Sequence, residues 1–309
     1  MIELIKKPQF LVHLSGVLFA TIFGFSFMFS KVALQYISPI GLISYRFAIA
    51  FIVFEILRRF KLVTIRFSKH HIKAILLVVI LQPILYFLFE VNGLQRTSSS
   101  EAGMMIALIP IFASILGAIL LKEKPTLTQI FFIVLSVSGI ILIQIFKSTS
   151  GIQFESLGFF LLFGAVISAA LFNIASRNAS KQLKAYELTY FMMMIGAITF
   201  NSIYIVSLII TGSLEQYALN LLNPSLIFPL IYLGIIASIV AFFLVNFTLS
   251  RLEAHVSSIY ANLATIVAIT AGAVFLDETL YYYHFIGSAM IIIGVYGTVS
   301  LGRGLKRLK

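Results

Sequence analysis

The chain contains no cysteine and little charge. Of its 309 residues, 11% are charged, whereas soluble domains carry about 25%. The absence of cysteine excludes disulfide bonds, thiolate metal ligands and cysteine nucleophiles. Because 60% of the residues are apolar and the mean hydropathy is +1.06, too few charges remain to solvate the surface of a soluble protein. The composition therefore predicts a polytopic membrane protein.

Apolar runs follow one another along the whole chain, and each has about the ~20 residues that an α-helix needs to cross the hydrocarbon layer. The strand alternation of a transmembrane β-barrel is absent. We predict an all-α polytopic membrane protein with ten transmembrane helices. The expected spans, numbered 1 to 10, are residues 11–30, 38–57, 74–93, 102–121, 127–146, 156–175, 187–211, 226–248, 254–276 and 284–302.

The 22 Lys and Arg residues divide unevenly between alternate connecting segments. With the N-terminus in the cytoplasm, 18 fall in cytoplasmic segments and only three, Lys31, Arg96 and Lys147, in outer segments. This asymmetry predicts that both termini are cytoplasmic. We expect the protein to lie in the plasma (inner) membrane. The asymmetry also accounts for the net charge of +11, so we expect no nucleic-acid partner.

The two halves of the chain resemble each other. With an offset of 155 residues, LLKEKPTLTQIFFIVLSVSGI (120–140) aligns with FLDETLYYYHFIGSAMIIIGV (275–295). With an offset of 146, FGFSFMFSK (23–31) aligns with AALFNIASR (169–177), which pairs Lys31 with Arg177. Five spans in each half place the second repeat upside down relative to the first. Inverted repeats are typical of secondary transporters, whose substrate site lies near mid-membrane between the halves.

At this point the chain resembles a known family, the EamA-type ten-helix transporters of the drug/metabolite transporter superfamily. The resemblance rests on FGFSFMFSK, PIGLISYRF (39–47), YFLFEVNGLQRTSSSEAGMMIALIPIF (86–112), LLKEKPT and NFTLSRLEAHVSSIYANLAT (246–265). It implies two five-helix repeats, residues 1–147 and 148–309, that export a small metabolite such as an amino acid by alternating access. It also implies a central site lined by spans 1, 3, 4, 6, 8 and 9.

Arg46 and Glu90 are charged residues within apolar spans, where a charge costs about 2.5–3.5 kcal/mol on insertion scales. Glu90 is near the end of span 3, and two roles fit it: a site for a substrate amine or a proton, or a side chain that reaches the outer headgroups. Arg46 is in span 2 and needs a partner. Glu90 would satisfy it, and so would backbone carbonyls within the bundle.

Uncharged polar side chains in the spans are further candidates, because hydrocarbon cannot satisfy their hydrogen bonds. They either hold helices together or line a polar cavity. Pro83 and Pro110 interrupt spans 3 and 4, and such breaks often lie near a transport site. The substrate-binding candidates beside Glu90 and Arg46 are Ser26, Tyr86, Asn173, Asn246, Tyr260 and Asn262.

Four acidic residues near span ends have a simpler interpretation. Ser98 and Glu101 have the spacing of a capping box, and Glu123, Asp277 and Glu278 also lie beside helix ends. We interpret them as helix caps, and a gating role stays open for Glu123 and Glu278 because they occupy equivalent positions in the repeat.

Three classes of function fit a chain of this kind. We expect a secondary active or facilitative transporter whose partners are a small-molecule substrate, the lipid bilayer and protons as coupling ion, in a monomer or homodimer. An intramembrane lipid-linked enzyme and a non-transporting membrane scaffold are the alternatives. No phosphate loop, dinucleotide fingerprint or metal-binding helix pattern occurs, so we expect no catalytic residue, cofactor or metal.

Overall fold

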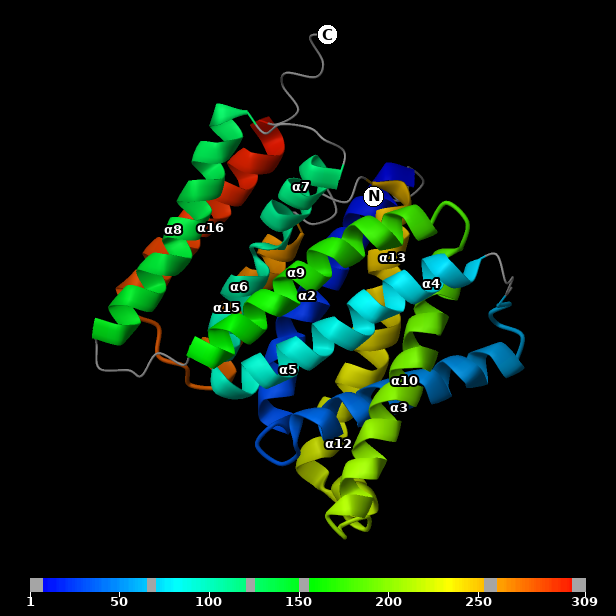
Figure 1. Ribbon diagram of the computed structural model, residues 1–309. Coiled ribbons are helices and arrows are strands. Elements are labelled where there is room, and N and C mark those ends of the chain that lie inside the picture. The colour runs from blue at the N-terminus through cyan, green and yellow to red at the C-terminus, as the bar shows by residue number, and fades with distance from the viewer. Residues whose placement is uncertain (1–7, 66–70, 121–125, 150–155, 253–259, 302–309) are drawn as a thin grey trace.

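The computed structural model describes residues 8–65, 71–120, 126–149, 156–252 and 260–301. Every regular element in these ranges is a helix (Figure 1). In chain order, with η marking π-helical stretches, the elements are α2 (Pro8–Ala33), α3 (Pro39–Arg59), α4 (Ile72–Val79), η2 (Ile80–Leu85), α5 (Tyr86–Arg96), α6 (Ser99–Ile106), α7 (Ile109–Leu120), α8 (Leu127–Thr149), α9 (Ser156–Ala179), α10 (Ala185–Ile210), α11 (Gln216–Leu222), α12 (Pro224–Ile231), η3 (Tyr232–Val240), α13 (Ala241–Arg251), α15 (Ala261–Phe275) and α16 (Tyr282–Leu301).

Seven helical segments of the described chain are long and apolar enough to cross a membrane, which confirms an all-α polytopic membrane protein. Three further apolar helices are shorter within the described residues. The seven segments are Leu11–Ala33, Pro39–Arg59, Ile72–Arg96, Ser99–Gly117, Ser156–Ala179, Ala185–Ile210 and Pro224–Arg251, and the shorter helices are Ile130–Ile143, Leu263–Phe275 and Tyr282–Gly294. That the chain crosses the membrane ten times, as two inverted repeats, remains a prediction.

Three of the long segments are interrupted. The third span changes from α4 to the π-helical η2, which contains Pro83, and then to α5. The fourth span is broken between α6 and α7, two residues before Pro110, and the eighth changes to the π-helical η3 between α12 and α13. Proline has no N–H to donate to the preceding turn, and π-helical turns leave backbone groups shifted from their usual partners. Both proline breaks expected from the sequence are therefore present.

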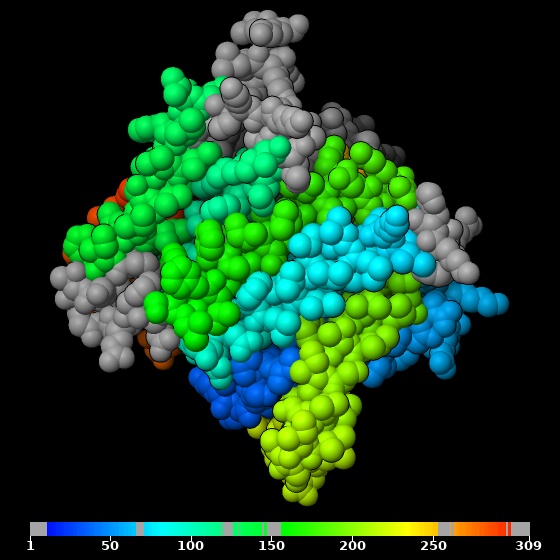
Figure 2. Space-filling model, in the orientation of Figure 1, coloured from blue at the N-terminus to red at the C-terminus, as the bar shows by residue number. Residues whose placement is uncertain are grey.

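Helices far apart in the sequence pack in pairs around α2 and α9, which cross the middle of the bundle in Figure 1. α2 contacts α13 and α15, α9 contacts α5 and α7, α3 contacts α10, and α8 contacts α16. Large apolar side chains remain exposed on the outer surface, including Leu76, Leu77, Phe160, Ile198 and Phe228. Figure 2 shows α4, α5, α9 and α10 side by side on one such face, which suits contact with lipid acyl chains.

The start of α6 is capped twice. Ser98 and Glu101 form the predicted capping box, with the Glu101 N–H donating to Ser98 Oγ over 3.1 Å. Glu278, in the segment between α15 and α16, accepts hydrogen bonds from the N–H groups of Ser99 and Ser100 at 2.7 and 3.0 Å and from both hydroxyls. The prediction that Glu278 caps a helix is thus confirmed, although the helix belongs to span 4 and not to its own. Glu123 lies outside the described residues.

Candidate functional site

A cavity lies between the helices that surround α2 and α9, with an empty volume of about 750 Å³ that includes the solvent at its mouth. Its walls come from α2, α3, η2, α5, α6, α7, α9, α13 and α15. These elements belong to the six spans expected to line a central site, with span 2 added through Arg46. The lining residues are Phe19, Phe23, Ser26, Phe27, Arg46, Gln82, Tyr86, Phe87, Glu90, Ile106, Ile109, Ala169, Phe172, Asn173, Phe242, Val245 and Ala264.

Arg46 is 2% exposed, lines the cavity from α3 and forms hydrogen bonds with η3. Its Nε donates to Ser238 Oγ over 2.8 Å, and one terminal nitrogen donates to the Ala237 carbonyl over 3.4 Å. The guanidinium carbon lies 4.5 Å from the centre of the Phe87 ring, a cation–π contact. Since a guanidinium has five N–H donors, these contacts leave donors for a ligand in the cavity.

Glu90 lines the same cavity from α5 and is also 2% exposed. Within the described part of the chain, its Oε2 has no hydrogen-bond partner and no ion pair joins it to Arg46. The direct ion pair between Arg46 and Glu90 that the sequence suggested is therefore not formed. The two opposite charges face the same cavity separately. A buried carboxylate without a partner is costly, so this arrangement is typical of a site that awaits a ligand or a proton.

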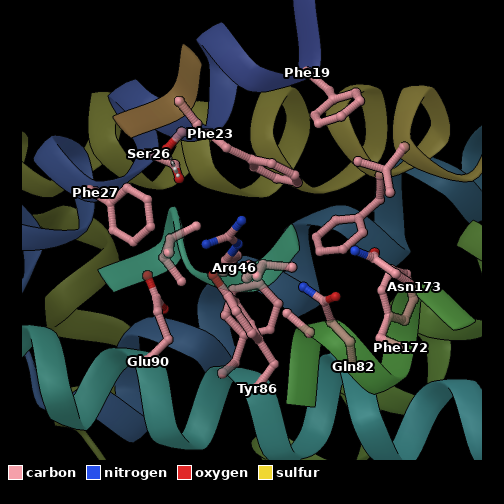
Figure 3. Close-up of a pocket in the computed structure, with 17 residues that line it drawn as sticks. Phe19, Phe23, Ser26, Phe27, Arg46, Gln82, Tyr86, Glu90, Phe172 and Asn173 are labelled. Carbon is pink, nitrogen blue, oxygen red and sulfur yellow. Dashed lines mark hydrogen bonds between the residues drawn. The ribbon is translucent and has the colours of Figure 1, made fainter. Parts of the chain in front are cut away.

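Uncharged polar groups occupy other parts of the wall. Tyr86 lies one helical turn before Glu90, and Gln82 lies in the break that precedes α5. Asn173 contributes an amide from α9. Figure 3 shows Gln82 and Asn173 on the side of the cavity away from Glu90, with Arg46 between the two regions. The polar groups therefore divide into a charged end and an amide end.

Aromatic rings form most of the remaining surface. Phe242 lies at the centre of this set, with ring centres 5.3 Å from Phe23, 6.1 Å from Phe87 and 6.5 Å from Phe172. Phe19 packs edge-on against Phe23 at 6.1 Å. Such walls bind apolar or aromatic groups and exclude water around the charged end.

The sequence-based candidates thus divide into two groups. Ser26, Tyr86, Glu90, Asn173 and Arg46 line the cavity, although the Ser26 hydroxyl donates to the Phe23 carbonyl of its own helix over 2.8 Å. Asn246 and Tyr260 are not part of its wall.

Asn246 is completely buried and joins three helices. It accepts from Ser176 Oγ over 2.8 Å and donates to Thr189 Oγ1 over 2.9 Å, so α13, α9 and α10 meet at its amide. Tyr260 forms a hydrogen bond with His13 Nδ1 and packs against Phe19. Asn262 lies in α15, and its side chain is outside the described residues.

Gln82, in the wall, and Ser238, behind it, were not expected from the sequence. Gln82 directly precedes Pro83, and an amide next to a proline within an apolar run is the signal that identifies it. Ser238 positions Arg46, and nothing in an isolated serine of an apolar run indicates that role. No cluster of His, Asp or Glu that could bind a metal occurs in the described ranges.

Comparison with known proteins identifies the family. The EamA-like transporter family model matches residues 10–145 and again residues 156–300, which together form most of the chain. The chain belongs to this family and so to the drug/metabolite transporter superfamily, and it is an integral membrane transporter. The resemblance inferred from the sequence is confirmed.

Individual relatives agree with this assignment. The chain is 38% identical over 308 residues to "Uncharacterized transporter YcxC" of Bacillus subtilis (strain 168), covering 98% of each protein. It is 28% identical over 212 residues to the "Probable amino-acid metabolite efflux pump" of Escherichia coli (strain K12), covering 67% of this chain and 70% of that protein. One solved crystal structure has the same fold, with a TM-score of 0.62 at 14% identity over 94% of this chain and 98% of that chain.

Proposed function

We propose that this transporter exports a small zwitterionic metabolite such as an amino acid, as a secondary active or facilitative carrier. One observation carries the proposal: Arg46 and Glu90 are both buried in the wall of one cavity, and no ion pair between them is found in the described chain. Opposite charges that are kept apart in an apolar bundle are suited to a ligand that carries both complementary charges.

The chemistry of the charged end fits the two ends of an α-amino acid. The free donors of Arg46 would bind a carboxylate, and Glu90 would accept hydrogen bonds from an ammonium group. In the absence of substrate, a proton on Glu90 would neutralise its charge, which makes protons the natural coupling ion. The similarity to the "Probable amino-acid metabolite efflux pump" of E. coli supports this class of substrate.

We further propose that residues 1–147 and 148–309 are two inverted five-helix repeats. The twofold match of the family model, once in each half, supports this division. So do two contacts of the α8–α16 pair. A Cβ on Gly139 would lie 2.7 Å from the carbonyl oxygen of Gly287, and one on Gly294 would lie 2.5 Å from that of Phe132. An offset of 155 residues relates Gly139 to Gly294 and Phe132 to Gly287, so the two contacts are equivalent in the two repeats.

Lys31 and Arg177, the basic pair aligned by the repeat, supply independent support. Lys31, near the end of α2, donates to the carbonyls of Leu94 and Thr97 where α5 ends. Arg177, near the end of α9, donates to the carbonyl of Leu252 where α13 ends. Thr97 and Leu252 are also offset by 155 residues, so equivalent cations bind equivalent helix ends.

This pairing suggests how access alternates. The charge asymmetry predicts cytoplasmic termini. In a ten-span topology with this orientation, the Lys31 contact lies at the outer surface and the Arg177 contact at the cytoplasmic surface. Opening the cavity to one side would break the contact on that side and preserve the other. The breaks in spans 3 and 8, which are equivalent positions of the two repeats, would give each half a point of bending.

Transport by the purified protein in liposomes tests the proposal. Vesicles loaded with one unlabelled amino acid should take up the same labelled amino acid by exchange, across a panel of amino acids, amines and carboxylic acids. We expect uptake of zwitterions and little uptake of compounds that have only one of the two charges. Equal uptake of the singly charged analogues would contradict the two-charge site, and no uptake of any panel member would contradict the function.

The topology needs a separate measurement. A tag at the C-terminus should be accessible to an impermeant reagent only after the cells are opened. Labelling of the tag in intact cells would place the C-terminus outside and would contradict the proposed orientation.

A further inference from the structure

We propose that Gln82 selects the substrate by its side chain, favouring amino acids that carry a hydroxyl, amide or N–H group at the far end of an apolar body. This inference rests on the proposed function, because it assumes that Arg46 and Glu90 hold the charged groups of the substrate. It assigns a separate task to the opposite end of the same cavity.

The backbone explains why Gln82 faces the cavity. In the π-helical η2, Gln82 has φ −151° and ψ 115°, which is extended and not helical. The chain therefore turns between α4 and α5 at this residue, and the Gln82 side chain lines the cavity although the residue is only 6% exposed. A regular helix through this segment would not present the side chain in the same way.

The Gln82 amide carries two donors and an acceptor and lines the cavity, and its polar atoms are not among the buried, unpaired ones in the described part of the chain. They are therefore open to the cavity, where a polar ligand can reach them. The neighbouring lining groups at this end are the Asn173 amide and the rings of Phe19 and Phe172 (Figure 3).

The spacing sets the length of the substrate. Gln82 and Glu90 lie on opposite sides of the cavity, with Arg46 between them (Figure 3). A substrate whose charged groups are held by Arg46 and Glu90 therefore needs a side chain of several bonds to reach the amide. Aromatic rings along this path would contact the apolar body of that side chain.

Discrimination follows from the cost of leaving the amide unpaired. A site built to hydrogen-bond a substrate group rejects the analogue that lacks the group, whereas an apolar pocket discriminates only weakly. A net hydrogen-bond contribution near the upper end of its usual range corresponds to about tenfold in apparent affinity. We therefore expect tyrosine over phenylalanine, and glutamine over norleucine, an unbranched apolar amino acid that lacks the amide, by about this factor.

The test compares Gln82→Leu and Gln82→Met with the wild type in the liposome exchange assay, using those two substrate pairs. The variants should lose the preference for the polar-tipped member while still transporting phenylalanine and norleucine, which also shows that they fold. Asn92→Leu is the matched control, because Asn92 lies on the same span but donates to the Leu88 carbonyl of its own helix over 2.8 Å and is not in the cavity wall.

Each result has a defined meaning. An unchanged preference in both Gln82 variants, or no preference in the wild type, would overturn the role of Gln82 while leaving the proposed function intact. Failure of the wild type to transport any amino acid would overturn the proposed function, and this inference with it.

Discussion

Replacing Glu90 with Gln should weaken transport without harming the fold. The substitution preserves size and hydrogen-bonding capacity but removes the negative charge that faces the cavity. Hydrogen bonds to charged groups contribute about 1.5–3 kcal/mol, so losing one to a substrate ammonium should reduce apparent affinity by about 10- to 150-fold.

The amount of protein in the membrane should stay near the wild-type level or rise. Glu90 is 2% exposed and its Oε2 has no partner in the described part of the chain, so the substitution breaks no hydrogen bond at that oxygen. A neutral side chain is also cheaper to insert into the membrane than a charged one. A fall in transport therefore cannot be attributed to unfolding when the level is unchanged.

Exchange and net uptake measured in liposomes at two pH values provide the assay. If Glu90 carries the coupling proton, the Gln variant should also lose part of the pH dependence of the wild type. Glu101→Gln is the control, because Glu101 lies in the capping box of α6 and Gln can still accept from the Ser98 N–H. Wild-type rates in the Glu90 variant at both pH values would refute the cavity role of Glu90 and leave Arg46 without its complement.

Four other substitutions test the architecture. Neutralising Lys31 should favour opening of the cavity on the outer side, and neutralising Arg177 should favour opening on the cytoplasmic side. The accessibility of the cavity to a reagent added on each side measures this. Shifts in the same direction in both variants would argue against equivalent contacts. Asn246→Leu should lower the free energy of unfolding by about 1 kcal/mol or more, because two hydrogen bonds between helices are lost and their partners stay buried. An unchanged unfolding temperature would contradict that role. Glu278→Gln should destabilise the start of α6 by about 1 kcal/mol, because a charge at a helix N-terminus is removed, and hydrogen exchange there should rise; unaltered exchange would exclude Glu278 as a significant cap.

The sequence predicts the membrane-spanning helices well, because length and apolarity alone decide whether a segment can cross a bilayer. The expected spans 11–30, 38–57 and 156–175 fall within the segments Leu11–Ala33, Pro39–Arg59 and Ser156–Ala179 to within a few residues. The positions of the internal breaks were partly predictable, since Pro83 and Pro110 mark two of them. The π-helical stretch η3 has no proline of its own, and packing against α2 and α3 is not visible in one sequence.

The candidate site was predicted less completely. Charges within apolar spans identified Arg46 and Glu90 because burial makes them expensive, but the sequence could not show that Ser238 and Phe87 hold Arg46 apart from Glu90. A polar residue in a span can equally join helices, and Asn246 does so. The sequence gives the number of hydrogen bonds that such a residue needs, and only the packing of neighbouring helices decides which partner supplies them.

Protection of a single cysteine in the cavity wall tests the central claim most directly, because the chain has no native cysteine to interfere. Ser26→Cys places a thiol in the wall at a position whose hydroxyl bonds only to its own helix among the described residues. In a transport-active variant, a hydrophilic thiol reagent should reach this cysteine from either side of the membrane, and a saturating transported amino acid should slow the reaction severalfold. A reaction rate that no transported compound changes would show that substrate does not pass through this cavity.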